Sequence, residues 1–113
     1  AQLNKIEVLI KKKRSLFLRY KKNLQDINEL NLVEEPIHSR SNYWLNTIIL
    51  DENIKKKERD VILKLLNESK IYARPIWKPL YKLPMYNKNP KDNLHTCKQL
   101  EYRIINLPSS SHI

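Results

Sequence analysis

Apolar residues recur every three or four positions over residues 2–27, and this spacing predicts one long amphipathic helix. The repeat consists of Leu3, Ile6, Ile10, Phe17, Tyr20, Leu24 and Ile27, and lysine and arginine fill the opposite face. A helix with a single apolar stripe has to bury that stripe. We expect it to pack on a sheet of the same domain.

Residues 43–50 (YWLNTIIL) form the strongest strand signal, because the segment is dense in β-branched and aromatic side chains. Its nearly continuous apolar character predicts a central strand that is buried on both faces. A weaker strand is expected over residues 30–33. Asp51 and Asn53 are suited to cap a second helix, whose apolar face ends near Ser69.

The segment Ile71–Tyr86 (IYARPIWKPLYKLPMY) concentrates prolines, aromatic side chains and cations. It cannot be a regular helix, because Pro75, Pro79 and Pro84 remove backbone donors and favour extended geometry at the preceding residues. We expect a strand over residues 71–76 followed by stiff, extended chain. Such a segment loses little entropy on binding a ligand. The alternative is a plain strand with its aromatic rings in the core and its cations in water.

Residues 87–93 are polar and predict a loop. Asn89 as a cap and Pro90 in the first turn predict a third helix that runs to about Arg103, followed by a short strand over 104–107. The resulting order is helix, strand, strand, helix, strand, helix, strand. It predicts one α+β domain, in which a small, mostly antiparallel sheet of three to four strands packs against three helices.

The chain has 113 residues and a net charge of +10. A basic chain has affinity for polyanions, but here the basic runs fall on predicted amphipathic helices, where they form solvated faces, so nucleic acid is not the expected partner. The runs are Lys11–Arg14, Lys21–Lys22 and Lys55–Lys57. No apolar run approaches the roughly 20 residues of a membrane span and no signal-peptide pattern is present. A single cysteine, Cys97, fits a reducing compartment, so we expect a cytoplasmic protein without a membrane partner.

The absence of glycine excludes several catalytic motifs. A P-loop, a dinucleotide-binding fingerprint and a Gly-x-Ser-x-Gly elbow all require glycine. His38, His95 and His112 are far apart and have no metal-ligand spacing, so no metal site is expected. No nucleophile is accompanied by a base, and we expect no catalytic residue in this chain.

Several segments in this order and spacing resemble the C-terminal small domain of the DegT/StrS family of pyridoxal-phosphate-dependent nucleotide-sugar aminotransferases. They are AQLNKIEVLIKKKRSLFLRYKKNL, SNYWLNTIIL, ARPIWKPLYKLPMY and CKQLEYRIINLPSS. The most specific parts are Arg74-Pro75-x-Trp77-Lys78-Pro79-Leu80 and Leu107-Pro108-Ser109. The resemblance implies that residues 1–113 form the small domain of a fold-type I aminotransferase.

The resemblance also implies what this chain lacks. In the family a large N-terminal domain carries pyridoxal phosphate on a lysine in a glycine-rich, serine-containing context, and no lysine here has such surroundings. We therefore expect the chain to be a piece of a longer protein, without the cofactor and inactive by itself. The parent would be a homodimer that transfers an amino group from an amino acid, with glutamate expected as the donor, to a nucleotide-linked keto-sugar.

The resemblance implies substrate-binding roles for Arg74, Trp77, Lys78 and Tyr81. Arg74 matches the arginine of the family's Arg-Pro pair, and its rigid fork of donors suits a diphosphate or sugar hydroxyls. Trp77 and Lys78 match a Trp-Lys pair, and Tyr81 stands where many members have histidine. The structural alternative places Trp77 in the core and makes Lys78 a surface charge.

The chain departs from the family where many members have glycine. Ser69-Lys70 and Ile104 occupy those positions, and because a side chain resists positive φ we expect the local turns to differ. Two rival functions stay open. The first is a small basic module that binds single-stranded nucleic acid through Trp77, Tyr81 and Lys78 by stacking and charge. The second is a structural or dimerising remnant whose first helix self-associates.

Overall fold

The computed structural model describes residues 2–110. The elements follow one another as η1 (Gln2–Lys5), α1 (Ile6–Leu24), β1 (Leu30–Leu32), β2 (Asn46–Leu50), α2 (Lys56–Glu68), β3 (Arg74–Pro75), η2 (Leu80–Lys82), η3 (Pro84–Tyr86), α3 (His95–Leu100) and β4 (Ile104–Leu107). The η elements are short 3₁₀ helices.

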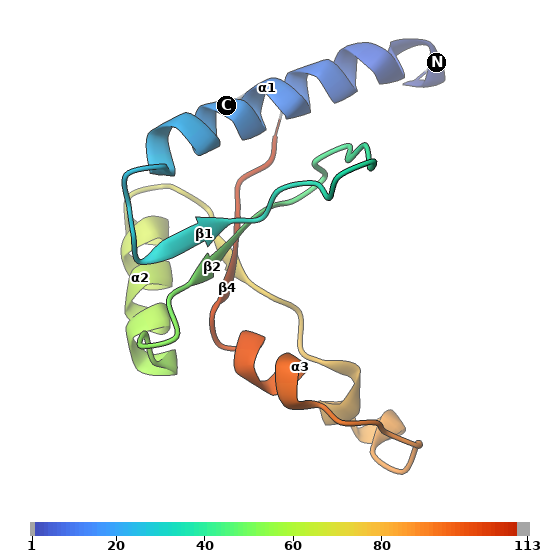
Figure 1. Ribbon diagram of the computed structural model, residues 1–113, viewed down its shortest axis with the longest axis vertical. Helices are drawn as coiled ribbons and strands as arrows, with labels where there is room; N and C mark the ends of the chain where they lie inside the picture. Colours follow the sequence, from blue (N-terminus) through green and yellow to red (C-terminus); the bar gives the residue numbers. More distant parts are fainter. Residues whose placement is uncertain (1, 111–113) are drawn as a thin grey trace.

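The strands form one sheet in the order β1-β2-β4-β3, and all neighbouring strands are antiparallel. Strand β2 is therefore central, as predicted. The predicted α+β fold, with a mostly antiparallel sheet and three helices, is confirmed. Figure 1 shows the sheet in the middle of the molecule, with α1 across one end and α3, η2 and η3 beyond the other end.

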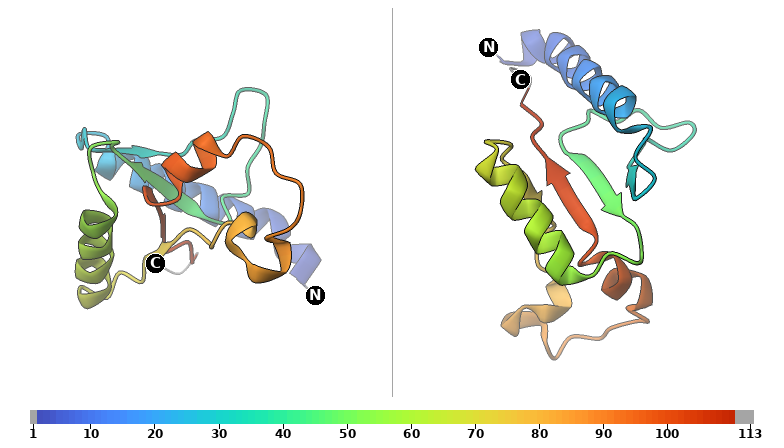
Figure 2. Two further views of the ribbon diagram at one scale, coloured as in Figure 1. Left: turned by 90° about the horizontal axis from the view of Figure 1, so that it is seen from below. Right: turned by 90° about the vertical axis from the view of Figure 1, so that its left-hand side faces the viewer.

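One face of the sheet carries the core. The register pairs Ile48 with Ile105, and the alternation of side chains places Leu50 and Leu107 on the same face. All of these residues are buried, and Ile105 is fully inaccessible. Helices α1 and α2 lie beside the sheet (Figure 2). Their side chains that pack against this core are Tyr20, Leu24, Ile62, Leu63 and Leu66. Burial of this apolar surface is the main stabilising term of the fold.

The first helix is shorter than predicted and buries only part of its stripe. Phe17 is 4% exposed, and Tyr20 and Leu24 pack on the core, whereas Leu3 is 80% exposed and Ile6 46%. The reason is visible in Figure 1, where the N-terminal half of α1 extends beyond the sheet. The prediction that the stripe packs on the domain's own sheet therefore holds only for the C-terminal half of the helix.

Strand β2 starts at Asn46, three residues later than predicted, because the backbone turns at Tyr43. Tyr43 has φ 46°, in the left-handed region, so the extended conformation cannot include it. The prediction of burial on both faces holds only in part. Ile48 and Leu50 are buried, whereas Thr47 and Ile49 on the other face are half-buried.

The second and third helices begin later than predicted. Asp51 accepts a hydrogen bond from the Asn53 backbone (2.9 Å) in a turn before α2, and the Glu58 carboxylate accepts one from the Lys55 backbone (2.7 Å) at the actual start. The bond at Asp51 holds a local turn, which competes with helix formation there. The bond at Glu58 belongs to a capping box, which stabilises the first turn of a helix and places the start of α2 at Lys56.

For the third helix, the prediction of a start at Asn89 and Pro90 is wrong. The Asn93 side chain accepts from the His95 backbone (2.9 Å), and α3 spans only His95–Leu100. Strand β3 covers Arg74–Pro75 instead of residues 71–76. Proline has no backbone donor and therefore limits the length of a ladder.

The turn after α2 keeps the left-handed geometry that glycine usually provides. Lys70 has φ 64°, and its backbone N–H donates to the Asn67 carbonyl (3.0 Å) while that of Ile71 donates to the Leu66 carbonyl (2.9 Å). These bonds form a Schellman motif, which normally has glycine at the Lys70 position. The expectation that this turn would differ without glycine is wrong, because the side chain is tolerated in the left-handed conformation.

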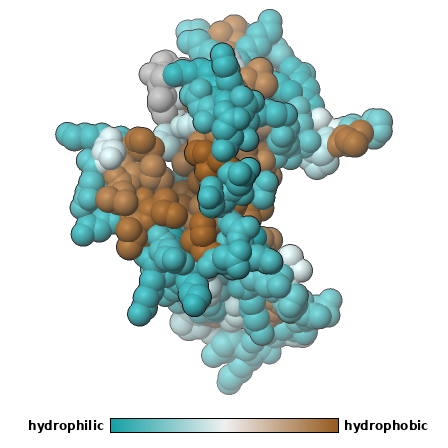
Figure 3. All heavy atoms as spheres, turned by 60° about the vertical axis from the view of Figure 1, so that its left-hand side comes forward, coloured by the Kyte–Doolittle hydropathy of each residue, from teal (hydrophilic) through white to brown (hydrophobic). Residues whose placement is uncertain are grey.

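Apolar side chains also reach the surface on the outer side of α2. Val61 is 55% exposed and Leu65 57%. Figure 3, which brings this side of the molecule forward, shows apolar atoms gathered across its middle. Surface of this kind is typical of faces that contact another domain or subunit.

Candidate functional site

A cavity of about 500 Å³ lies beside the β3–β4 edge of the sheet, and we call it the Arg74 cavity. Its lining includes Leu45, Tyr72, Arg74, Trp77, Asn106 and Ser109. These residues come from the start of β2, from β3 with its flanks and from the end of β4. The antiparallel pairing of both β2 and β3 with β4 brings them together, although they span more than 60 positions in sequence.

Arg74 lies on the sheet face that α1 and α2 do not cover. It pairs with Asn106 in the ladder, and Asn106 pairs with Thr47 on its other side, so these residues form a polar row across the sheet. The Thr47 hydroxyl donates to the Asn106 Oδ1 atom (2.8 Å), which orients the amide. Arg74 is exposed, and no carboxylate among residues 2–110 forms an ion pair with it. The guanidinium is therefore available for an anion from outside.

Trp77 is 68% exposed, so the alternative that placed it in the core is wrong. Its ring centroid lies 5.9 Å from that of Trp44, and the two rings are inclined at 44°. Trp44 itself is 60% exposed. Trp44 was not predicted as a site residue, because it belongs to the segment that was predicted as a buried strand.

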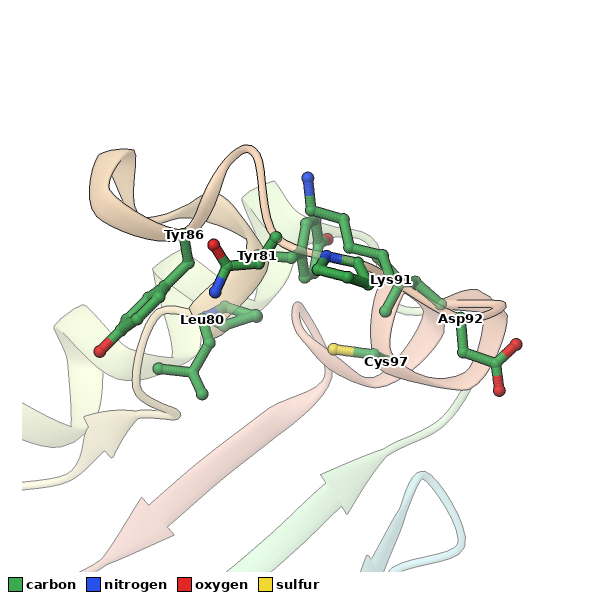
Figure 4. A pocket seen from close by; sticks show the side chains of 10 residues that line it. Leu80, Tyr81, Tyr86, Lys91, Asp92 and Cys97 are labelled. Atoms are coloured by element: carbon green, nitrogen blue, oxygen red, sulfur yellow. The ribbon is translucent and has the colours of Figure 1, made fainter.

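Tyr81 lies elsewhere, in a second and more apolar cavity of about 620 Å³ that we call the Tyr81 cavity. Leu80, Tyr86 and Cys97 of α3 line it, and the Asp92 carboxylate points outward (Figure 4). The Tyr81 hydroxyl donates to Glu101 (3.3 Å), and burial together with the negative charge of Glu101 raises the pKa of Tyr81.

Lys78 is exposed and lines neither cavity. The structure thus brings together two of the four predicted site residues, Arg74 and Trp77. Tyr81 and Lys78 are separate from them.

Behind Tyr81, Lys82 is held by two partners. Its ammonium lies 2.6 Å from the Glu101 carboxylate and donates to the Tyr102 hydroxyl (2.7 Å), and these bonds raise the pKa of Lys82 above its ordinary value. The Glu101 side chain is only 10% exposed. This cluster fastens η2 to the end of α3. Sequence analysis missed it because the partners lie about 20 positions apart in irregular segments.

The Leu107-Pro108-Ser109 motif is bound to the first helix. The Tyr20 hydroxyl donates to the Pro108 carbonyl (2.9 Å), and the Lys13 ammonium donates to the Ser109 carbonyl (2.7 Å). Burial raises the pKa of Tyr20. These bonds fix the segment that forms one side of the Arg74 cavity.

Residues 2–110 do not fit pyridoxal phosphate, the cofactor that the family resemblance implies. A lysine that binds a carbonyl group covalently has to be neutral, which a lowered pKa favours. Lys82 has the opposite shift, and Lys13, the other half-buried lysine in this range, is bonded to a carbonyl. The chain also has no glycine for a phosphate-binding loop.

Within residues 2–110, no group of three or more histidine, cysteine, aspartate or glutamate side chains is placed to hold a metal ion. His112 lies outside the described residues. In the part of the chain that the structure describes, no helix has both the length and the apolar character needed to cross a bilayer.

Comparison with known proteins decides the family. The profile of the DegT/DnrJ/EryC1/StrS aminotransferase family matches residues 1–113. This chain belongs to that family. The chain is similar to the pyridoxal phosphate-dependent aminotransferase EpsN of Bacillus subtilis, with 33% identity over all of this chain and 29% of EpsN. It is also 33% identical to the GDP-perosamine synthase of Vibrio cholerae, over 96% of this chain and 29% of that protein.

Solved structures have the same fold. The aminotransferase PseC of Helicobacter pylori, which takes part in pseudoaminic acid biosynthesis, superposes with a TM-score of 0.85 at 21% identity, over 97% of this chain and 30% of PseC. DesI, solved with its TDP-sugar product, gives a TM-score of 0.84 at 21% identity, over 98% of this chain and 29% of DesI. The chain thus spans less than a third of the length of the relatives that it matches.

Proposed function

We propose that this chain is the C-terminal small domain of an aminotransferase that moves an amino group from an amino acid, with glutamate as the proposed donor, to a nucleotide-linked keto-sugar. Membership of the family supports the reaction class. The descriptions of two similar proteins, a GDP-perosamine synthase and DesI with its TDP-sugar product, support a sugar nucleotide as the substrate. The free guanidinium in the Arg74 cavity is the observation within this chain that carries the proposal.

The proposal divides the work between two domains. Pyridoxal phosphate, when bound, supplies the chemistry that carries the amino group. We assign it to a large N-terminal domain, because the residues described here do not fit it, and we expect the 113-residue chain to be inactive by itself. The active form is a cytoplasmic homodimer, with its active sites near the subunit interface.

Within this chain, Arg74 and Trp77 bind the substrate. Arg74 donates a fork of hydrogen bonds to the diphosphate or to sugar hydroxyls, and Trp77 covers one side of the ligand. Lys78 follows Trp77 directly and supplies a second cation. Tyr81 lines the other cavity, so its contact with the sugar requires a ligand that extends beyond the Arg74 cavity.

The rival functions have less support. A surface for single-stranded nucleic acid needs aromatic side chains and cations in one continuous groove, but Trp77 and Tyr81 line different cavities and Lys78 lines neither. A dimerising remnant would use the exposed apolar positions at the start of α1. Those positions are equally suited to contact the large domain.

The test uses the protein translated from the complete reading frame that contains this chain. Purified protein is incubated with glutamate and a nucleotide-linked keto-sugar, and the amino sugar is detected by mass spectrometry. We expect glutamate-dependent product in the wild type. Arg74→Ala should lower kcat/KM for the sugar by about 10- to 100-fold, the effect of losing a charge-assisted hydrogen bond.

Arg40→Ala is the matched control, because Arg40 is also an exposed arginine but pairs with Glu7 on a different part of the surface. It should leave kcat/KM unchanged. No amino sugar from any of a panel of nucleotide-linked keto-sugars would exclude the proposed reaction. Equal activity of Arg74→Ala and wild type would exclude the proposed role of Arg74.

A further inference from the structure

The two tryptophans of this chain lie together on the surface. They are the only tryptophans in the sequence. Their ring centroids are 5.9 Å apart, yet Trp44 is 60% exposed and Trp77 68%. Tryptophan is highly buried on average, so two adjacent exposed indoles form a platform that requires an explanation.

The fold holds Trp44 at the surface through the residue before it. Tyr43 takes the left-handed conformation, with φ 46°, and turns inward, where it is 6% exposed and stacks on Phe17 with ring centroids 3.9 Å apart. The chain reverses its side-chain direction at this point, and the Trp44 backbone N–H donates to the Asn42 side chain (3.0 Å). Trp44 is therefore directed outward by a defined turn.

An ion pair fixes that turn. The Arg14 guanidinium donates two bonds to the Glu35 carboxylate (2.6 and 2.9 Å) and one to the Ser41 carbonyl (2.8 Å). Glu35 also accepts from the Ser41 backbone (2.6 Å). Glu35 and Ser41 lie at the two ends of the segment that leads into Tyr43. This network therefore limits the movement of that segment and of the Trp44 indole that follows Tyr43.

The platform adjoins the Arg74 cavity. Trp77 lines that cavity, and so does Leu45, the residue next to Trp44. Inside the cavity, Arg74 offers charge and donors to phosphate, while Asn106 and Ser109 offer polar groups to hydroxyls. The indole faces offer neither, but they bind flat, unsaturated rings by stacking. This arrangement suits a molecule with a planar ring at one end and a phosphate beside it.

We propose that Trp44 and Trp77 together hold the nucleobase of a nucleoside diphosphate whose phosphates lie at Arg74. This assignment rests on the proposed function and adds to it a second tryptophan and the part of the substrate that each group recognises. Trp44 then binds the substrate at a distance from the reacting atoms. Its stacking does not depend on which base is present, because every base has a π face.

The test uses intrinsic fluorescence of the 113-residue chain, since all indole emission comes from this platform. The probes are uridine and guanosine 5′-diphosphates, the free nucleosides, inorganic pyrophosphate and glucose, with N-acetyltryptophanamide as the correction for absorbance. Both diphosphates should quench the emission saturably, the nucleosides more weakly, and glucose not at all. Quenching by glucose as strong as that by the diphosphates would overturn the assignment to the base.

Variants separate stacking from charge. Trp44→Ala, read through Trp77, should raise the Kd for both diphosphates by about 10-fold, the loss expected for one stacked base. Pyrophosphate, titrated by its competition with the diphosphates, should keep its Kd. Tyr86→Ala is the control, because Tyr86 is an exposed aromatic residue of the other cavity. An unchanged Kd in Trp44→Ala, with a wild-type circular dichroism spectrum, would overturn the role of Trp44.

The two proposals fail in different ways. If the diphosphates bind as described but no amino sugar is formed, the nucleotide site stands and the proposed reaction falls. If amino sugar is formed and Arg74→Ala impairs it while Trp44→Ala binds the diphosphates like the wild type, the proposed function stands and the present assignment falls.

Discussion

Lys70 occupies a backbone conformation that favours glycine, and its replacement by glycine should stabilise the domain. The residue ends α2 with φ 64° and carries the hydrogen bonds of a Schellman motif. A side chain in the left-handed region costs about 1–2 kcal/mol. Glycine removes this cost but gains freedom in the unfolded chain, which offsets about 0.5–1 kcal/mol.

The net effect of Lys70→Gly is a gain of about 0.5–1 kcal/mol in the free energy of unfolding. For a domain of this size that corresponds to a rise in Tm of about 2–6 °C. The assay is urea unfolding followed by far-ultraviolet circular dichroism, supported by a thermal scan. The Lys70 ammonium has no carboxylate partner among residues 2–110, so no ion pair is lost.

Lys64→Gly is the matched control. Lys64 lies inside α2 with ordinary helical geometry, and its pair with Glu68 is long (3.8 Å) and exposed. There the same change should lower the free energy of unfolding by about 1 kcal/mol. If Lys70→Gly destabilised the domain as much as Lys64→Gly does, the left-handed assignment of Lys70 would be refuted.

Two further predictions concern the core and the Arg14–Glu35 pair. Ile105→Ala should lower the free energy of unfolding by about 2–5 kcal/mol, because Ile105 is fully buried. Leu18→Ala, at a position that is 61% exposed, should change it by less than about 0.5 kcal/mol in the same urea assay. The bonds from Arg14 and from the Ser41 backbone lower the pKa of Glu35 from 4.5 to about 2. The ionised Glu35 carboxylate therefore stabilises the fold fully above pH 4.5, and this contribution is lost as the pH falls toward 2. As the pH is lowered from 4.5 to 2, the urea midpoint of the Glu35→Gln variant should accordingly fall less than that of the wild type. Parallel curves of urea midpoint against pH for the two proteins would contradict the Arg14–Glu35 pairing.

The sheet and its layers could be predicted because they depend on local pattern. Dense β-branched and aromatic residues identified β2, and the repeat of three and four identified the first helix. The ends of the elements could not be predicted, because tertiary contacts set them. Tyr43 leaves the strand so that its ring can stack on Phe17 of a distant helix, and nothing in YWLNTIIL indicates that partner.

Buried polar groups show the same limit. Asn46 is 1% exposed, and neither its Oδ1 nor its Nδ2 atom has a hydrogen-bond partner within residues 2–110. Arg59 is also buried on the packed side of α2. An arginine in such a pattern is normally assigned to the exposed face. Asn46 lies in the segment predicted to be buried on both faces, but the sequence gives no partner for its amide.

Two of the four predicted site residues lie together in the structure, and their roles stay predictions. The Arg-Pro-x-Trp spacing placed Arg74 and Trp77 on one extended segment, and they do line one cavity. Tyr81 follows only four residues later, but the 3₁₀ turns after Pro79 redirect the chain toward α3. Trp44 joins the site from the turn before β2, which sequence spacing cannot reveal.

The most direct test of the account separates the two halves of the proposed reaction. In single-turnover experiments on the protein from the complete reading frame, one half consumes glutamate and the other consumes the nucleotide-linked keto-sugar. We predict that Arg74→Ala leaves the glutamate half at the wild-type rate and weakens the apparent affinity for the sugar nucleotide in the other half by about 10- to 100-fold. Equal loss in both halves, or no loss in either, would contradict the claim that Arg74 faces the sugar nucleotide.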